Sequence, residues 1–119
     1  MAIHVRPRSK YGAIKETVDG ITFHSRKEAN RYRELRLLEK AGEIHDLQLQ
    51  SRYDLTVGPS LATKIGEYRA DFQYCECRRA DKCAQSQVVV EDVKGMDTPL
   101  SKWKRKHVKA QYGIEVRIV

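Results

Sequence analysis

The stretch Val88–Gly95 most restricts what this chain can fold into, because it combines the pattern of a buried strand with charged side chains. Three consecutive valines favour a buried β-strand, and Glu91, Asp92 and Lys94 follow before a glycine ends it. Burying a charge costs free energy unless the charge is paired or bound to a metal, so we expect these charges to have a role. Successive strand residues point to opposite faces. Asp92 and Lys94 therefore share one face, and we leave Glu91, on the other face, out of the candidate site.

The size and charge of the chain fit a small domain that binds a polyanion. We expect the 119 residues to form one domain, 1–119, in which residues 1–10 are a flexible basic arm. The net charge of +7 favours nucleic acid as the partner, although a basic protein without that role has the same composition. No apolar run is long enough to cross a bilayer, and the N-terminus lacks the apolar region of a signal peptide. Since the cysteines number three, an odd count, we expect a reducing compartment, the cytoplasm, and no membrane partner.

The order of the periodic segments predicts an α/β fold with an αβββαβ core and an N-terminal β-hairpin. Asp19-Gly20 is typical of a hairpin turn, Ser25 and Glu28 match a capping box, and Gly42 is a suitable helix stop. Short connections between the three central strands indicate antiparallel pairing, and we expect a mixed sheet flanked by two helices. The expected elements are a hairpin over 11–24, a helix from 26 to about 41, strands over 47–57, 65–74 and 88–94, a helix over 99–111 and a strand over 114–119.

Alternating side chains predict the face on which each candidate residue lies. In the strand over 65–74, the even-numbered residues from Tyr68 to Tyr74 form an apolar face, so Asp71 points the other way. One face of the second helix is apolar, and basic residues cover much of the remainder. We expect that face to lie in the core, and Trp103 to be a core residue rather than a platform for base stacking. Its members are Leu100, Trp103, His107 and Ala110.

Two aspartates on neighbouring strands make a candidate metal site. Asp71 and Asp92 can approach each other across the sheet, and two carboxylates with a neighbouring backbone carbonyl, that of Val93, suit Mg²⁺ or Mn²⁺. Lys94 can orient a metal-bound water or stabilise charge on a phosphoryl oxygen. The same residues can instead form a salt-bridged edge of the sheet. Glu28 has two alternative roles, as the acid of the capping box or as a third acid that faces the sheet.

Four segments of the chain form a combined pattern. They are Lys10-Tyr11-Gly12, Asp19-Gly20-Ile21-x-Phe23-x-Ser25-x-x-Glu28, Tyr68-x-Ala70-Asp71-Phe72 and Val89-Val90-Glu91-Asp92-Val93-Lys94-Gly95. Together they resemble a family of small, mostly phage-encoded proteins of the PD-(D/E)XK nuclease superfamily, and the resemblance covers nearly the whole chain. The D…DxK pattern alone is unspecific, and its combination with the Ser-x-x-Glu helix and the hairpin makes the resemblance more specific.

The resemblance implies a metal-dependent endodeoxyribonuclease with a restriction-endonuclease-like core. It implies that Asp71 and Asp92 bind the metal and that Lys94 is the catalytic lysine. Glu28 matches the acid that many members carry on the first helix. The superfamily's proline before the first aspartate is Ala70 here, a departure that leaves the carboxylate in place. A phage-encoded protein of this kind would act in the host cytoplasm.

Basic residues of the second helix are the candidate contacts to DNA phosphates, and such contacts do not depend on base sequence. They are Lys102, Lys104, Arg105, Lys106 and Lys109. A small domain offers little surface for reading a sequence. We therefore expect a Mg²⁺-dependent DNA endonuclease that recognises DNA structure, such as branched recombination or replication intermediates. A homodimer would allow two cuts on two strands.

Two other functions stay open from the sequence. The first is a non-catalytic DNA-binding accessory module that retains the nuclease fold. The second is a zinc-stabilised interaction protein, because Cys75, Cys77 and Cys83 together with a histidine are suitable zinc ligands. No CxxC pair is present and the four histidines lie elsewhere in the sequence, so we do not expect structural zinc here.

Overall fold

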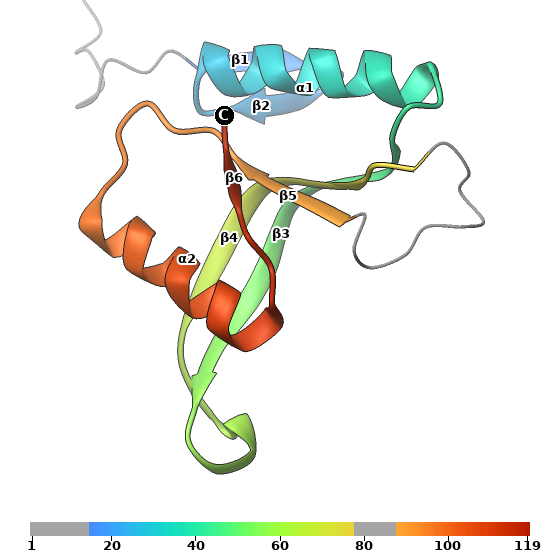
Figure 1. The fold of residues 1–119 in the computed structure, drawn as a ribbon. Helices are drawn as coiled ribbons and strands as arrows, with labels where there is room; N and C mark the ends of the chain where they lie inside the picture. The colour runs from blue at the N-terminus through green and yellow to red at the C-terminus, as the bar shows by residue number, and fades with distance from the viewer. Residues whose placement is uncertain (1–14, 78–87) are drawn as a thin grey trace, which may run out of the picture.

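The computed structural model describes residues 15–77 and 88–119, and these ranges confirm the predicted order of elements (Figure 1). A hairpin of β1 (Glu16–Val18) and β2 (Ile21–Phe23) precedes helix α1 (Arg26–Lys40). There follow β3 (His45–Val57), the 3₁₀ turn η1 (Pro59–Leu61), β4 (Thr63–Cys75), β5 (Val88–Asp92), helix α2 (Pro99–Tyr112) and β6 (Arg117–Ile118). Neither helix in these ranges is long and apolar enough to span a membrane.

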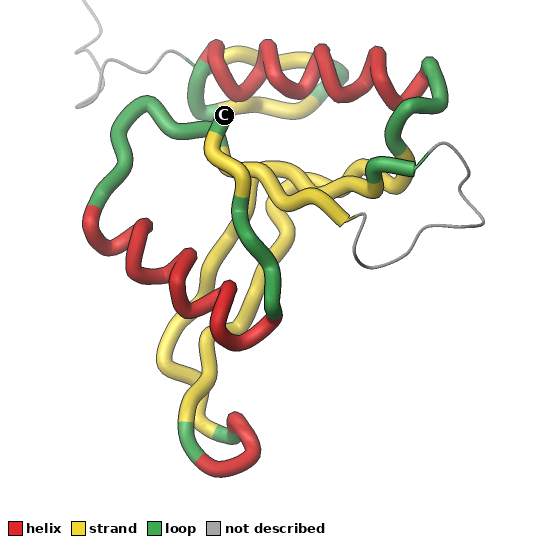
Figure 2. The backbone as a smooth tube through the Cα atoms, in the orientation of Figure 1, coloured by secondary structure: helices red, strands yellow, loops and turns green. Residues whose placement is uncertain are grey.

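The central sheet is mixed and has the strand order β3-β4-β5-β6. The β3–β4 and β4–β5 pairs are antiparallel, whereas β6 pairs parallel with β5. β5 is therefore an interior strand, which agrees with its run of valines. Because β5 pairs with β4 only from Phe72 to Cys75, the rest of β3 and β4 extends beyond it as a two-stranded ribbon that ends at η1 (Figures 1 and 2).

The two helices cover opposite faces of the sheet. One cluster of buried residues joins Leu35 of α1 to Phe72 of β4 and Val89 of β5. The other joins Val108 of α2 to Val90 of β5. Val89 and Val90 are consecutive in one strand, so their side chains point to opposite faces. The β1–β2 hairpin lies on the α1 side, where Phe23 belongs to the first cluster.

Local sequence chemistry explains where several elements begin and end. Asp19 and Gly20 have φ values of 52° and 76°, the left-handed conformation that a two-residue hairpin turn requires. Ser25 caps α1, because its side chain accepts a hydrogen bond from the backbone N–H of Glu28 at 3.1 Å. Gly113, with φ of 71°, ends α2 in the same left-handed region.

The even-numbered residues of β4 are buried as predicted, but they do not share one apolar face. Tyr68 and Ala70 belong to the cluster on the α2 side, whereas Phe72 and Tyr74 belong to the cluster on the α1 side. The change coincides with Gln50 of β3, which has φ of 54° and which the regular pairing with β4 skips. Such a local distortion increases the twist of a strand pair, so that one strand contributes to both faces.

The predicted apolar face of α2 is wrong. The buried residue of this helix is Val108, whereas Leu100 is 62% and Trp103 is 55% exposed. α2 packs on the β3–β4 ribbon through Val108 and through several polar contacts, and an apolar pattern does not reveal the polar ones. His107 Nε2 donates to the Thr56 carbonyl at 3.0 Å, and further bonds join Gln111 to Thr56, Lys104 to the Glu67 carbonyl and Tyr112 to the Asp54 carbonyl.

Candidate functional site

Asp71 of β4 and Asp92 of β5 lie side by side, as the sequence predicted. The antiparallel register pairs Phe72 with Glu91, which leaves the two aspartates at the next position along the strands. Burial first, and then a hydrogen bond to the Asp92 carboxyl group, raise the pKa of Asp71 to about 8. The site therefore favours the protonated form of the Asp71 carboxyl group when no cation is bound.

Neighbouring groups hold both aspartates in position. Asp71 Oδ2 accepts a hydrogen bond from the backbone N–H of Val93 at 2.8 Å. Because this N–H turns to a side chain instead of the backbone of β4, β5 ends at Asp92, two residues before the predicted end of the strand. Asp92 is 3% exposed, and its Oδ2 accepts from the Tyr68 hydroxyl at 2.5 Å and lies 3.1 Å from Lys94 Nζ.

Lys94 shares the face of Asp92, as the alternation predicted, although it lies beyond the end of β5. Its backbone is fixed from two sides. The N–H of Lys94 donates to the Val119 carbonyl at 3.3 Å, and its own carbonyl accepts from Lys27 Nζ of α1 at 2.9 Å. The ammonium group is thus presented to Asp92 from a segment that contacts both the C-terminal strand and the first helix.

The carboxylate of Glu28 is directed toward Gln50 and the aspartates, whereas the cap of α1 uses the backbone N–H of Glu28 rather than its side chain. Its backbone N–H completes the Ser25 cap, while its carboxylate lies 3.5 Å from Gln50 Nε2. Gln50 Nε2 also donates to Asp71 Oδ1 at 3.3 Å, and it therefore lies between the two acids. Burial raises the pKa of Glu28. In the described parts of the chain, no three His, Cys, Asp or Glu side chains gather closely enough to hold a metal ion.

Glu91 lies on the opposite face of β5 from Asp92, as the alternation predicted. It is fully buried on the α1 side. Arg31 of α1 donates to its two carboxylate oxygens at 2.8 and 2.6 Å, and the Tyr74 hydroxyl donates to it as well. Glu91 therefore joins the first helix to the sheet, while the next residue, Asp92, faces the candidate site.

Gln50 and Tyr68 are site residues that the sequence analysis missed. Gln50 stands on the polar side of an alternating strand, and its contact with Asp71 follows only once the register of β3 and β4 is known. The alternation assigned Tyr68 to the apolar face, and its ring is indeed buried. Its hydroxyl nevertheless reaches Asp92, since a buried tyrosine usually finds a partner for its polar end.

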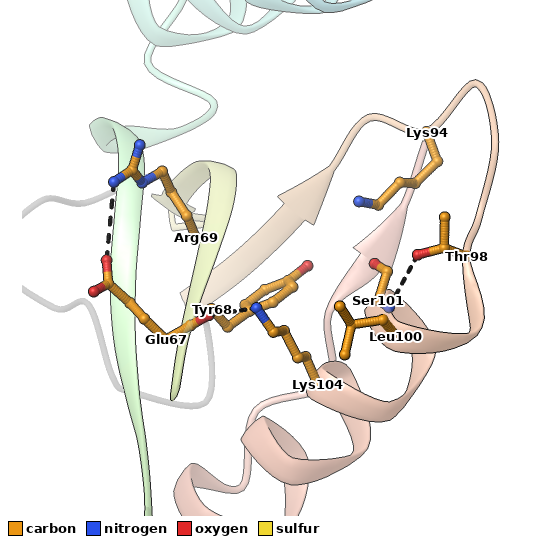
Figure 3. A pocket seen from close by; sticks show the side chains of 8 residues that line it. All are labelled: Glu67, Tyr68, Arg69, Lys94, Thr98, Leu100, Ser101 and Lys104. Atoms are coloured by element: carbon orange, nitrogen blue, oxygen red, sulfur yellow. Dashed lines mark hydrogen bonds and ion pairs between the residues drawn. The ribbon is translucent and has the colours of Figure 1, made fainter. Parts of the chain in front are cut away.

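A pocket of about 420 Å³, the Lys94 pocket, opens between β4 and the start of α2 (Figure 3). Figure 3 shows the ammonium groups of Lys94 and Lys104 directed into this space from two sides. Arg69 adds a third cation, against one acid, Glu67. The lining residues are Glu67, Tyr68, Arg69, Lys94, Thr98, Leu100, Ser101 and Lys104. The pocket thus continues the candidate site into a space lined with positive charge.

A second cavity of about 370 Å³, the basic groove, contains four of the five predicted DNA-binding residues. Its lining is Lys102, Arg105, Lys106, Lys109, Glu115 and Val116. The exposed members of the prediction are Lys102, Lys106 and Lys109. Arg105 is instead held by Asp97 through two bonds of 2.9 and 2.6 Å, so its guanidinium is not free for phosphate. Lys104 lines the Lys94 pocket and donates to the Glu67 carbonyl at 3.1 Å.

Two predicted features lie at least partly outside the described residues. The basic arm, residues 1–10, is one, and Cys83 of the suggested zinc-binding loop is the other. The sulfur atoms of Cys75 and Cys77 lie 3.3 Å apart.

A protein-family model matches residues 8–119, and its description is "Protein of unknown function (DUF1064)". No curated protein and no solved structure matches the chain significantly. Because the family match spans nearly all 119 residues, the chain belongs to the DUF1064 family.

Proposed function

We propose that this protein is a metal-dependent DNA endonuclease of the PD-(D/E)XK type, with Asp71, Asp92 and Lys94 in its active site. The observation that carries the proposal is the convergence of two aspartates from neighbouring strands, with Lys94 Nζ 3.1 Å from Asp92. The Lys94 pocket, with its three cations, supports a substrate that carries phosphate groups.

Asp71, Asp92 and the Val93 carbonyl would hold Mg²⁺, or Mn²⁺ in its place. The chemistry of the donors fits such an ion, because Mg²⁺ prefers a few hard oxygen ligands and keeps several waters. Burial first, and then the hydrogen bond with Asp92, raise the pKa of Asp71, and a bound cation would stabilise the charged form of this carboxylate. When bound, the metal makes a coordinated water more acidic and thus a better nucleophile near neutral pH.

The surrounding residues position these groups. Tyr68 donates to Asp92 and Gln50 donates to Asp71, so each aspartate is oriented by a neighbour. Lys94 now pairs with Asp92, and its ammonium would stabilise negative charge on the attacked phosphoryl group. Glu28 would act through Gln50 rather than as a direct ligand.

The test is a cleavage assay on supercoiled plasmid, linear duplex and four-way-junction DNA, each with Mg²⁺, Mn²⁺ or EDTA. We expect cleavage only with a metal, and faster cleavage of the branched substrate. Asp92→Asn and Lys94→Ala should each lower the rate by about 100-fold or more. Asp54→Asn and Lys40→Ala, which make the same charge changes at exposed positions, should keep it.

The alternative is a non-catalytic DNA-binding module. The observation that favours it is that the described residues contain no cluster of three metal-binding side chains. Tight binding of all three DNA substrates without cleavage under any metal condition would establish this alternative and overturn the nuclease proposal.

A further inference from the structure

We infer that Trp103 is a stacking platform for an unpaired DNA base. This inference rests on the proposed function for the identity of the ligand as DNA, and it names the feature of the substrate that the protein recognises.

The exposure of Trp103 requires an explanation. Burying a large apolar side chain stabilises a protein by about 1.5–3 kcal/mol, yet Trp103 in the first half of α2 is 55% exposed. The ring is nevertheless supported, since it meets His107 edge-on with 6.0 Å between the ring centroids. His107 is in turn held by the Thr56 carbonyl at 3.0 Å. The indole is therefore steadied on one side and open on the other, as a stacking surface must be.

Trp103 lies on the outer side of α2, between the two cation-lined cavities. Leu100, one turn before it, lines the Lys94 pocket. Lys106, one turn after it, lines the basic groove. Because each helical residue turns by about 100°, Trp103 projects between Leu100 and Lys106. A strand that runs over the outer face of α2, from Leu100 at the Lys94 pocket to Lys106 at the basic groove, therefore passes over the indole.

The positive charges on both sides of Trp103 indicate which ligand this surface binds. Cations beside an open aromatic ring are the chemistry by which proteins bind single-stranded nucleic acid, with phosphates on the cations and a base on the ring. A base inside a duplex is already stacked on its neighbours, whereas an unpaired nucleotide offers a free face. A second copy of this chain is disfavoured, because it would bring Lys102 and Lys106 against another surface of the same sign.

Trp103 is the only tryptophan in the chain, so its fluorescence reports on this position alone. The full chain in EDTA, which prevents cleavage, is titrated with oligothymidylate, with an abasic oligomer that has the same number of phosphates, and with a duplex of equal length. We expect oligothymidylate to quench the emission strongly, and the abasic oligomer and the duplex to bind with little quenching. Equal quenching by the abasic oligomer would overturn the inference.

The affinity of the variants gives a second measurement, made by anisotropy of labelled oligothymidylate. Trp103→Ala should weaken binding by roughly 5- to 100-fold, whereas Trp103→Phe should retain most of the affinity. Leu61→Ala removes another exposed apolar side chain, which is 52% exposed, and should have no effect. Unchanged affinity of Trp103→Ala would refute the stacking role, and a shift of the emission with protein concentration in the absence of DNA would indicate self-association instead.

These outcomes are separate from those of the cleavage assay. Stacking in EDTA without any cleavage in Mg²⁺ would keep the inference and overturn the nuclease. Cleavage in Mg²⁺ together with unchanged DNA affinity of Trp103→Ala would keep the nuclease proposal and overturn the stacking inference.

Discussion

Asp71 links the stability of the protein to pH. Burial first, and then Asp92, raise its pKa from the ordinary value of 3.8 to about 8, so the native state holds this proton more tightly than the unfolded state. The resulting contribution to stability is complete below the unfolded pKa and is lost as the pH rises through the folded one. Since one pKa unit corresponds to about 1.4 kcal/mol, we expect the free energy of unfolding in EDTA to fall by roughly 1–3 kcal/mol between about pH 6 and about pH 9.

Urea denaturation at the two pH values checks this prediction. Asp71→Asn should remove most of the fall, because an amide does not titrate, whereas Asp54→Asn at an exposed position should keep it. Mg²⁺ at the higher pH should restore stability to the wild type, since a cation replaces the lost proton. The same pH dependence in wild type and Asp71→Asn would contradict the raised pKa.

Glu91, which is fully buried, and Arg31, which is partly exposed, form an ion pair that joins α1 to the sheet. Arg31→Met would leave the carboxylate of Glu91, fully buried, without its charged partner, which typically costs about 3–5 kcal/mol. The double variant Arg31→Met, Glu91→Gln removes the charge as well and should recover part of the loss. Denaturation curves measure both effects. Any folded variant should retain metal-dependent cleavage, because Glu91 faces away from Asp92, and loss of cleavage in the folded double variant would place this pair in the active site.

Alternation along one strand is enough to place Glu91 and Asp92 on opposite faces, because alternation is a local property of the backbone. The contact of Gln50 with the candidate site cannot be predicted from alternation. Its contact with Asp71 depends on the register of two strands, and its left-handed backbone conformation is not marked by a glycine. The residues that could be predicted are thus those whose placement depends on near neighbours in sequence.

At the scale of elements, α2 yields a direct test of which helix face is buried. Val108 is fully buried, so Val108→Ala should destabilise the protein by about 1–2 kcal/mol through lost contacts and a small cavity. Leu100→Ala removes a larger side chain that is 62% exposed and should change stability by no more than about 0.5 kcal/mol. Thermal or urea unfolding of the two variants distinguishes the observed face from the predicted one, and a larger effect at Leu100 would contradict the structure.

The two helices differ in how much the sequence reveals. α1 begins and ends close to the predicted residues, because its cap and its glycine stop are local. Its buried residues Ala29, Tyr32 and Leu35 pack on apolar residues of the sheet. α2 packs on the ribbon through hydrogen bonds to backbone groups such as the Thr56 and Glu67 carbonyls. Hydrophobic periodicity carries no information about such contacts, so the helix was predicted correctly and its orientation was not.

At the scale of the whole molecule, the exposed lysines predict how strongly the affinity for DNA depends on salt concentration. Lys102, Lys106 and Lys109 are exposed, and all three line the basic groove. Each phosphate contact contributes about 0.7–0.9 to the slope of log affinity against log salt concentration. The triple alanine variant should therefore lower that slope by about 2–3, as measured by anisotropy with labelled junction DNA in EDTA. The lysines do not contact the aspartates, so the cleavage rate at saturating DNA should change by less than about twofold.

A second triple variant distinguishes the effect of lysines placed in the groove from the effect of the net charge of the chain. Lys15, Lys40 and Lys64 are exposed and lie away from the groove, so their replacement by alanine makes the same change in net charge. If the groove binds phosphates, this control should lower the slope by less than about 1, because distant charges act only through a screened field. An equal loss in both triple variants would mean that the +7 charge of the whole chain, and not the groove along α2, determines affinity for DNA.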